Sequence, residues 1–195
     1  MRIAIIGKGR VGTALASGLV RAGHEIKFGH RDPREAVRNA AEWGDAIILA
    51  VPFNSIKDVV REIGSAADGK ALVDATNSLG PNGELAIGFK TSGAEELQRS
   101  LPRASVIKAF NIVFAENLNW GAIGCEQLSA LIAGDDSDAK RIVIGLAHDI
   151  GFDPIDAGPL RSARFLEPLG MLLIGLGYGL KMGTGIGIKI VKAEH

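Results

Sequence analysis

Short apolar runs that alternate with segments of helical spacing restrict the fold of this chain more than any other feature. Residues 3–6 and 46–51 are apolar throughout, as in strands that are buried on both faces of a sheet. Strands are predicted at residues 3–6, 25–28, 46–51, 71–75, 105–109, 128–133 and 152–156. Helices are predicted at residues 11–22, 33–43, 55–63, 94–100 and 135–149, the last capped by Asp135, with a further helix from residue 161.

This alternation predicts an α/β protein with a Rossmann-type, doubly wound, mostly parallel sheet and a C-terminal helical segment. No internal repeat, low-complexity tract or linker interrupts the 195 residues. We therefore expect a single domain over residues 1–195.

Composition and charge exclude several classes of protein. Lys and Arg together number 22, as do Asp and Glu, which argues against a nucleic-acid or membrane-surface partner. Cys125 is the single cysteine and the four histidines lack ligand spacing, so neither disulfides nor a metal site is expected. The apolar run at the N-terminus ends at Gly7, too early for a signal peptide, and no tract reaches the ~20 residues of a membrane span. A cytoplasmic protein is the expectation.

A glycine motif lies at the junction of the first predicted strand and the first predicted helix. The segment Gly7-Lys8-Gly9-Arg10-Val11-Gly12 fits the pattern G-x-G-x-x-G. Gly7 makes the tight turn, Gly9 lets a pyrophosphate approach the backbone, and Gly12 lets the helix pack closely on the strand. Free N–H groups at the helix N-terminus attract the phosphates. This context favours dinucleotide binding over an ordinary turn that uses glycine for geometry alone.

The residues after the second predicted strand select the dinucleotide. A carboxylate there would bond the ribose hydroxyls of NAD, whereas basic residues suit the 2′-phosphate of NADP. Asp32 lies at the expected distance from the motif, but it directly precedes Pro33 and is explained as a helix cap. His30, Arg31 and Arg34 supply positive charge, and a guanidinium binds phosphate in a bidentate manner. NADP is therefore the predicted cofactor, with solvated surface charges as the alternative.

Three further strand ends are expected at the same crevice, because ligands of parallel sheets bind beyond the carboxyl ends of strands. Residues 51–53 could pack against the ribose and nicotinamide, while residues 75–77 and Asn111 could bond a carboxamide. The complete set of predicted cofactor-binding residues is Gly7, Gly9, Arg10, Val11, Gly12, His30, Arg31, Arg34, Val51, Pro52, Phe53, Ala75, Thr76, Asn77 and Asn111.

Two charged residues stand inside otherwise apolar predicted strands. Asp74 is interpreted as a carboxylate that fixes the following loop, and Lys108 as a side chain whose amine reaches solvent at the edge of the sheet. No acid–base pair is recognisable, so no catalytic residue is assigned. A reductase of a small imine or ketone would need a proton donor, for which Lys108, Asp74 and Thr76 are the candidates. A sensor module that binds NADP without turnover is the non-enzymatic alternative.

Several segments occur together in the pattern of one enzyme family. They are residues 7–12, 29–31 (Gly-His-Arg), 50–52 (Ala-Val-Pro), 108–111 (Lys-Ala-Phe-Asn) and 151–160 (Gly-Phe-Asp-Pro-Ile-Asp-Ala-Gly-Pro-Leu), followed by Ala163, Arg164 and Glu167. Over nearly its whole length the chain thus resembles the coenzyme F420-dependent NADP oxidoreductase family. Related domains in membrane ferric reductases use NADPH to reduce a flavin.

The resemblance implies an NADP-dependent oxidoreductase that transfers a hydride between NADP(H) and a deazaflavin (coenzyme F420) or flavin, without a protein acid or base. A C-terminal segment would close over the pocket of this small-molecule acceptor. The chain departs from the family at two points. Between Pro33 and Gly44 there is room for one helix only, so the usual edge strand is missing and residues 46–51 should pair directly with the first strand. His30 stands where the family often has serine, which removes one hydroxyl from the phosphate site.

The C-terminal segment, residues 160–195, carries seven glycines from Gly170 to Gly187. It is expected to be an acceptor pocket, a homodimer surface where small residues allow close approach, or both at once. Its candidate pocket residues are Met171, Leu172, Leu173, Tyr178 and Met182, and its candidate contacts to an anionic acceptor are Lys181, Lys189 and Lys192.

Overall fold

A seven-stranded sheet forms the centre of the chain, whose computed structural model describes residues 1–30, 36–80 and 83–193. Its strands are β1 (Arg2–Ile6), β2 (Glu25–Gly29), β3 (Ala46–Leu49), β4 (Ala71–Asp74), β5 (Ser105–Lys108), β8 (Ser129–Gly134) and β9 (Asp153–Asp156). They lie in the order β2-β1-β3-β4-β5-β8-β9, and every neighbouring pair is parallel except β5 and β8. The predicted Rossmann-type, mostly parallel fold is confirmed.

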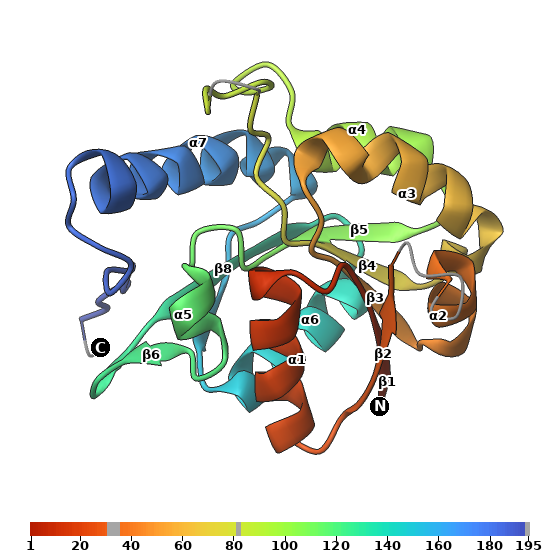
Figure 1. Cartoon of the computed structure of the whole chain (residues 1–195), viewed down its shortest axis with the longest axis horizontal. Coiled ribbons are helices and arrows are strands. Elements are labelled where there is room, and N and C mark those ends of the chain that lie inside the picture. The colour runs from red at the N-terminus through yellow and green to blue at the C-terminus, as the bar shows by residue number, and fades with distance from the viewer. Residues whose placement is uncertain (31–35, 81–82, 194–195) are drawn as a thin grey trace.

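Helices cover both faces of this sheet, which explains why residues 3–6 of β1 and all of β3 are apolar without alternation. The helices are α1 (Arg10–Arg21), α2 (Val37–Trp43), α3 (Ile56–Ile63), α4 (Gly93–Ser100), α5 (Ala115–Leu118), α6 (Ser137–Ile150) and α7 (Ala163–Ile174). Figure 1 shows α3, α4 and α7 on one side of the sheet and α1 and α6 on the other. Along β1, Ile3 and Ile5 pack into the core beneath α1 and α6, whereas Ala4 and Ile6 pack beneath α2 and α3.

The pairing of β3 with β1 confirms the expectation that the strand after residue 45 lies directly beside the first strand. Ile3 lies beside Ala46 and Ile6 beside Leu49 in a parallel register. Among the described residues between β2 and β3, the helix present is α2. The cap predicted at Asp32 and Pro33 lies outside the described residues, and the helix observed there begins at Val37.

Two predictions about charged residues were wrong. The side chain that caps α6 belongs to Asp136, which accepts hydrogen bonds from the N–H groups of Asp138 and Ala139, while Asp135 accepts one from Leu160. Lys108 does not reach solvent at an edge, because β5 lies between β4 and β8 and the residue is completely buried. The structure also contains α5 and a hairpin of β6 (Ala122–Ile123) and β7 (Glu126–Gln127), both too short to leave a sequence pattern.

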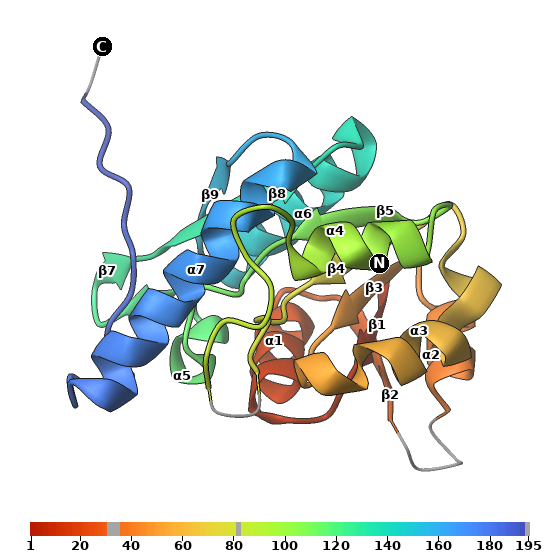
Figure 2. The same cartoon turned by 90° about the horizontal axis from the view of Figure 1, so that it is seen from above.

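The C-terminal segment is helical only in its first half. α7 continues into a π-helical turn (Gly175–Gly179), and residues 180–193 contain neither helix nor strand. Lys181 and Gly183 have left-handed backbones, with φ 58° and 80°, so the helix expected from residue 161 onward does not continue through them. The tail is tied to the body where the N–H of Ser129 donates to the carbonyl of Ile188 at 2.8 Å. Figure 2 shows the last residues leaving the body of the molecule.

Candidate dinucleotide and acceptor site

The turn between β1 and α1 is built from glycines that tolerate no side chain at two positions. Gly7 has a φ of 111° and donates its N–H to the carbonyl of Gly29 at 2.9 Å. A Cβ on Gly7 would collide with the carbonyl of Ala50, and one on Gly12 would collide with the carbonyl of Gly7. Gly9 differs: it has ordinary extended angles, φ −80° and ψ −172°, and faces open space. Because no side chain caps α1, the N–H groups of its first turn are available to an anion.

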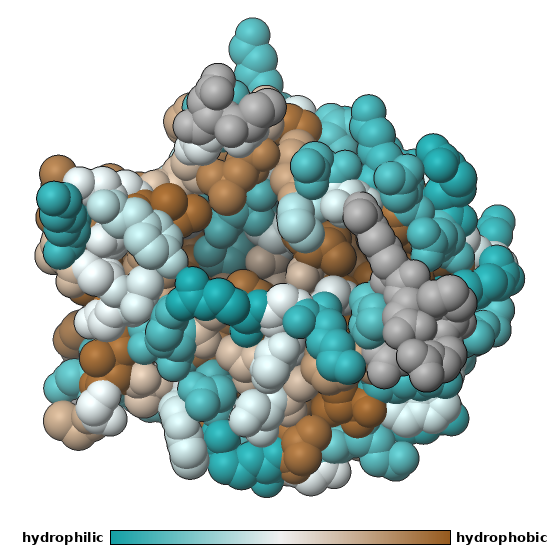
Figure 3. All heavy atoms as spheres, in the orientation of Figure 1, coloured by the Kyte–Doolittle hydropathy of each residue, from teal (hydrophilic) through white to brown (hydrophobic). Residues whose placement is uncertain are grey.

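A crevice of about 670 Å³ lies beyond the carboxyl ends of β1, β3 and β4. The predicted cofactor-binding residues that line it are Gly9, Arg10, Val11, Val51, Pro52, Phe53, Ala75, Thr76 and Asn77. Figure 3 shows this face hollowed across its middle, with apolar and neutral side chains around the hollow. We call this cavity the dinucleotide crevice.

A neighbouring pocket of about 250 Å³ continues the crevice past the glycine turn. Gly7 and His30 line it, and it shares Val51 and Pro52 with the dinucleotide crevice. Two carboxylates from α3, Asp58 and Glu62, also face this pocket. Arg31 and Arg34, which the sequence assigns to the 2′-phosphate, lie outside the described residues.

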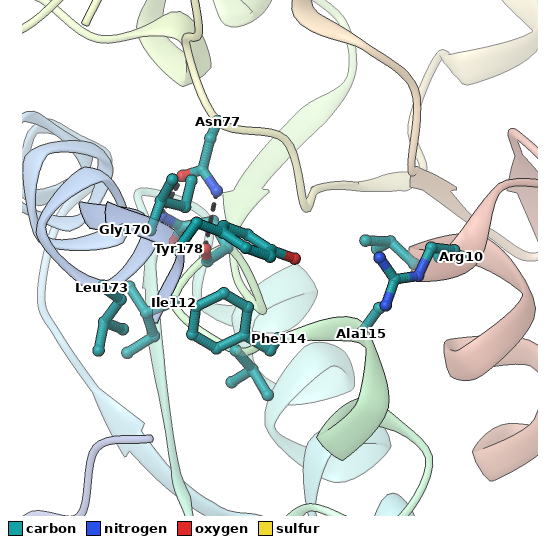
Figure 4. A pocket seen from close by; sticks show the side chains of 12 residues that line it. Arg10, Asn77, Ile112, Phe114, Ala115, Gly170, Leu173 and Tyr178 are labelled. Carbon is teal, nitrogen blue, oxygen red and sulfur yellow. Dashed lines mark hydrogen bonds between the residues drawn. The ribbon is translucent and has the colours of Figure 1, made fainter. Parts of the chain in front are cut away.

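A second pocket of about 230 Å³, lined mostly by apolar side chains, opens on the other side of the crevice. It shares Arg10, Val11 and Asn77 with the crevice, so the two cavities join at these residues. Its remaining lining consists of Asn111, Ile112, Val113, Phe114, Ala115, Gly170, Leu173, Ile174 and Tyr178. We call it the acceptor pocket. In Figure 4 the hydroxyl of Tyr178 points toward Arg10, and the Phe114 and Tyr178 rings meet edge to face with centroids 5.6 Å apart.

Two asparagines form the inner wall of the acceptor pocket. The Nδ2 of Asn77 donates to the backbone carbonyl of Asn111 at 2.9 Å, and the Nδ2 of Asn111 donates to the Oδ1 of Asn77 at 3.0 Å. The Oδ1 of Asn111 is buried and accepts no hydrogen bond from the described part of the chain. A Cβ on Gly170 would lie 2.5 Å from the Oδ1 of Asn77, so only glycine lets α7 approach the pair. Asn111 therefore lies at the acceptor pocket, past the crevice where the sequence placed it.

The three candidate proton donors are hydrogen-bonded to one another beneath the site. The Nζ of Lys108 donates to the Oδ2 of Asp74 at 2.9 Å and to the carbonyl of Thr76 at 2.6 Å. The hydroxyl of Thr76 donates to the Oδ1 of Asp74 at 2.7 Å, as does its N–H at 2.9 Å. Asp74 thus holds the loop after β4, as predicted. Lys108 and Asp74 line neither cavity.

The C-terminal segment contributes to the acceptor pocket less than the sequence predicted. Leu173 and Tyr178 line the pocket, but Leu172 and Met182 point to solvent and are each 58% exposed. Lys189 pairs with Glu126 of β7 at 2.6 Å, away from the pocket lining. Sequence reasoning missed residues 112–115, although this apolar run directly follows the Lys-Ala-Phe-Asn segment.

An ion pair that joins α4 to α7 gives a pH-dependent prediction. Hydrogen bonds from Arg164, at 2.7 and 2.9 Å, hold the pKa of the Glu95 carboxyl below its ordinary value of 4.5. A lowered native-state pKa stabilises the fold above the unfolded-state pKa, and the stabilisation is lost as the pH falls through the native value. We expect Glu95→Gln to lower the melting temperature by about 2 °C at pH 7 and by less at pH 3. An equal shift at both pH values, measured by circular dichroism, would contradict this account.

Membrane and metal features are absent from the described part of the chain. Within residues 1–30, 36–80 and 83–193, every helix is too short or too polar to cross a lipid bilayer. The same residues contain no group of three His, Cys, Asp or Glu side chains placed to bind a metal ion.

A Rossmann sheet whose glycine turn opens onto a crevice joined to an apolar pocket is typical of nicotinamide dinucleotide-binding oxidoreductases.

Comparison with known proteins supports this class. Residues 2–78 match the model of the family described as NADP oxidoreductase, coenzyme F420-dependent. The F420-dependent NADP reductase of Methanothermobacter marburgensis is 32% identical over 90% of this chain and 92% of its own. That of Methanocaldococcus jannaschii is 34% identical over 80% of this chain and 72% of its own. The chain belongs to the coenzyme F420-dependent NADP oxidoreductase family and is an NADP-dependent oxidoreductase, as predicted.

Two other relatives extend the comparison. A crystal structure from Arthrobacter sp. FB24, assigned to the F420-dependent NADP reductases, superposes with a TM-score of 0.91 at 28% identity, covering 98% of this chain and 100% of that chain. The metalloreductase STEAP3 of Rattus norvegicus is 29% identical over 89% of this chain. The chain spans only 37% of the length of STEAP3.

Proposed function

We propose that the protein transfers a hydride between NADP(H) and coenzyme F420, with a flavin as the alternative acceptor. The observation that carries the proposal is the junction of the dinucleotide crevice with the acceptor pocket at Arg10, Val11 and Asn77. Two flat ring systems bound in these cavities would meet at the junction. Relatives named F420-dependent NADP reductase support the choice of F420.

The residues of the site would act by binding and by excluding water. The first turn of α1 and the open approach at Gly9 would hold the pyrophosphate. Residues 51–53 and 75–77 would surround the ribose and nicotinamide, and Asn111 would face the acceptor. The apolar side chains of the acceptor pocket lower the local dielectric and keep water from the hydride. The bound cofactors supply the hydride chemistry itself.

The sequence around His30 is the part of this chain that we expect to recognise the 2′-phosphate, which distinguishes NADP from NAD. The described lining of the pocket beside His30 carries the carboxylates Asp58 and Glu62, which would repel a 2′-phosphate. Arg31 and Arg34 are therefore assigned the task of attracting it. Titration with NADPH and NADH tests this assignment: NADPH should bind more tightly, and a preference for NADH would refute it.

The acceptor is tested by mixing the protein with NADPH and, in turn, oxidised F420 and FMN while the absorbance of each acceptor is followed. We expect F420 to be reduced at the expense of NADPH, and faster than FMN. Faster reduction of FMN would assign the flavin as the acceptor. Reduction of neither, with NADPH still bound, would refute the proposal and leave the imine or ketone reductase and the sensor module as the candidates.

A reductase of a small imine or ketone remains the second candidate, because Tyr178 places a hydroxyl at the acceptor pocket. Tyrosine can donate the proton that such a reaction requires. Lys108, Asp74 and Thr76 are instead hydrogen-bonded to one another. We expect Tyr178→Phe to slow F420 reduction by no more than about threefold, because the ring and its packing against Phe114 are retained. An imine reductase would lose at least about 100-fold in kcat with the same change. Steady-state rates with F420 and with a cyclic imine distinguish the two.

We also propose that the end of the C-terminal segment contacts a second copy of the chain. Beyond α7, Leu180 is 72% exposed and Val191 is 84% exposed, and the tail between them contains neither helix nor strand. Exposed apolar side chains in an extended tail are typical of an oligomer interface. Light scattering coupled to gel filtration should give the mass of a dimer, and a monomer at high concentration would refute the proposal.

A further inference from the structure

A cluster of three buried charges lies beneath the junction of the two cavities. Asp74 at the end of β4, Lys108 at the end of β5 and Glu167 in α7 are each completely buried. The Nζ of Lys108 lies 2.9 Å from the Oδ2 of Asp74, 3.2 Å from the Oε1 of Glu167 and 2.6 Å from the carbonyl of Thr76. These three acceptors match the three N–H groups of an ammonium. None of the charges touches a cavity, so the cluster does not act on a ligand directly.

Glu167 connects this cluster to two further elements. Its Oε2 accepts hydrogen bonds from the hydroxyl of Ser78 at 2.5 Å and from the N–H of Gly93 at 2.9 Å, and its Oε1 accepts one from the N–H of Ala94 at 3.2 Å. Gly93 begins α4, where the helix dipole favours a carboxylate. One side chain of α7 is therefore bound to the loop after β4, to the end of β5 and to the start of α4.

The same face of α7 forms the wall of the acceptor pocket. Gly170 lies one turn beyond Glu167 and rests on the Asn77–Asn111 pair, and the carbonyl of Leu166 accepts a hydrogen bond from the Nδ2 of Asn111 at 2.8 Å. Leu173 lies one turn further on and lines the pocket. Any shift of α7 at Glu167 would therefore move the pocket wall relative to Asn77.

We infer that Glu167 is a positioning residue: through Lys108 and Ser78 it fixes α7 over the loop after β4 and thereby sets the gap between hydride donor and acceptor. The inference rests on the proposed function, because it assigns the nicotinamide to the β4 loop and the acceptor to α7. A buried cluster of charges suits this task, since hydrogen bonds between charged groups have a defined length and direction, whereas apolar contacts are non-directional.

The test compares two Glu→Gln variants of the same α4–α7 interface. Glu167→Gln keeps the volume and leaves a neutral Asp74–Lys108 pair. The Ser78 hydroxyl can accept from the new amide, while the N–H of Gly93 loses its acceptor. Glu95→Gln removes the other charge that joins α7 to α4, but it touches neither Lys108 nor the β4 loop. Three quantities are measured for each variant: the melting temperature, the Kd of NADPH, and the single-turnover rate of hydride transfer to F420.

For Glu167→Gln we expect the hydride-transfer rate to fall at least about 10-fold while the Kd of NADPH changes by less than about threefold. Glu95→Gln should leave both quantities within about twofold of the wild type. Equal slowing by the two variants, or an unchanged rate in Glu167→Gln, would overturn the inference.

The design also separates failure of the inference from failure of the proposed function. If the wild-type protein reduces no F420, the proposed function fails, and amide hydrogen exchange of α7 takes the place of the rate. Glu167→Gln should then accelerate exchange through residues 169–174, whereas Glu95→Gln should affect only the turn around Arg164. Unchanged exchange in Glu167→Gln would overturn the positioning role.

Discussion

Replacing Gly9 by alanine is expected to abolish NADPH binding while leaving the stability of the protein unchanged. The backbone of Gly9, with φ −80° and ψ −172°, is one that alanine adopts without strain. The new methyl group would meet no protein atom within 4 Å and would instead occupy the dinucleotide crevice, where the pyrophosphate approaches α1. We expect the Kd of NADPH, measured by fluorescence titration, to rise at least about 100-fold, or about 3 kcal/mol.

A matched control is available in α6. A Cβ on Gly145 also meets no atom within 4 Å, but this glycine lies in the interior of a helix that lines neither the crevice nor the acceptor pocket. Gly145→Ala should leave the Kd unchanged and stabilise the protein by up to about 1 kcal/mol, because alanine is the better helix former. If Gly9→Ala bound NADPH as tightly as Gly145→Ala does, the pyrophosphate would not lie at the glycine turn.

Replacing Lys108 by methionine is expected to be the most destabilising conservative change in the chain. Methionine fills the same volume, but Asp74 and Glu167 would be left as two buried carboxylates without their cation. Removing one partner of a buried ion pair costs about 3–5 kcal/mol of the free energy of unfolding. Urea denaturation of the purified protein measures this loss.

Two further variants test whether the loss of the positive charge of Lys108 causes the destabilisation. Adding Glu167→Gln to Lys108→Met removes one of the two buried carboxylates that lack a cation, so the double variant should be more stable than Lys108→Met alone. Lys140→Met breaks a pair with Asp156 whose carboxylate is 55% exposed, and it should cost no more than about 1 kcal/mol. If Lys108→Met were as stable as Lys140→Met, the ion pairs of Lys108 would not stabilise the fold, which contradicts this account.

The dinucleotide half of the site could be predicted from sequence because its signals are local. The glycine turn, its preceding apolar strand and its following helix occupy consecutive residues, and parallel strands bring their carboxyl ends together by topology alone. Every described residue predicted to bind the cofactor lines one of three adjoining cavities, except Gly12, which packs beneath the turn.

The acceptor half could not be predicted in the same way, because its parts come from distant segments. Glu167 and Ser78 are 89 positions apart, and no pattern in the sequence marks them as partners. Lys108 was misread as an edge residue because the pairing of β8 beside β5, which closes that side of the sheet, is a long-range event. The glycines after α7 indicated that a plain helix would not continue to the end of the chain, and Gly183 has the left-handed backbone that glycine favours.

The central claim is that a hydride passes directly from NADPH to F420 across the junction at Asn77. The most direct measurement uses NADPH deuterated at the transferable nicotinamide position, with mass spectrometry of the reduced F420. Because the acceptor pocket is apolar and the candidate acids are bonded to one another, the deuterium should appear in the reduced F420 without exchange into water. Deuterium found in the solvent, or reduced F420 free of the label, would contradict direct transfer and with it the proposed arrangement of the two cavities.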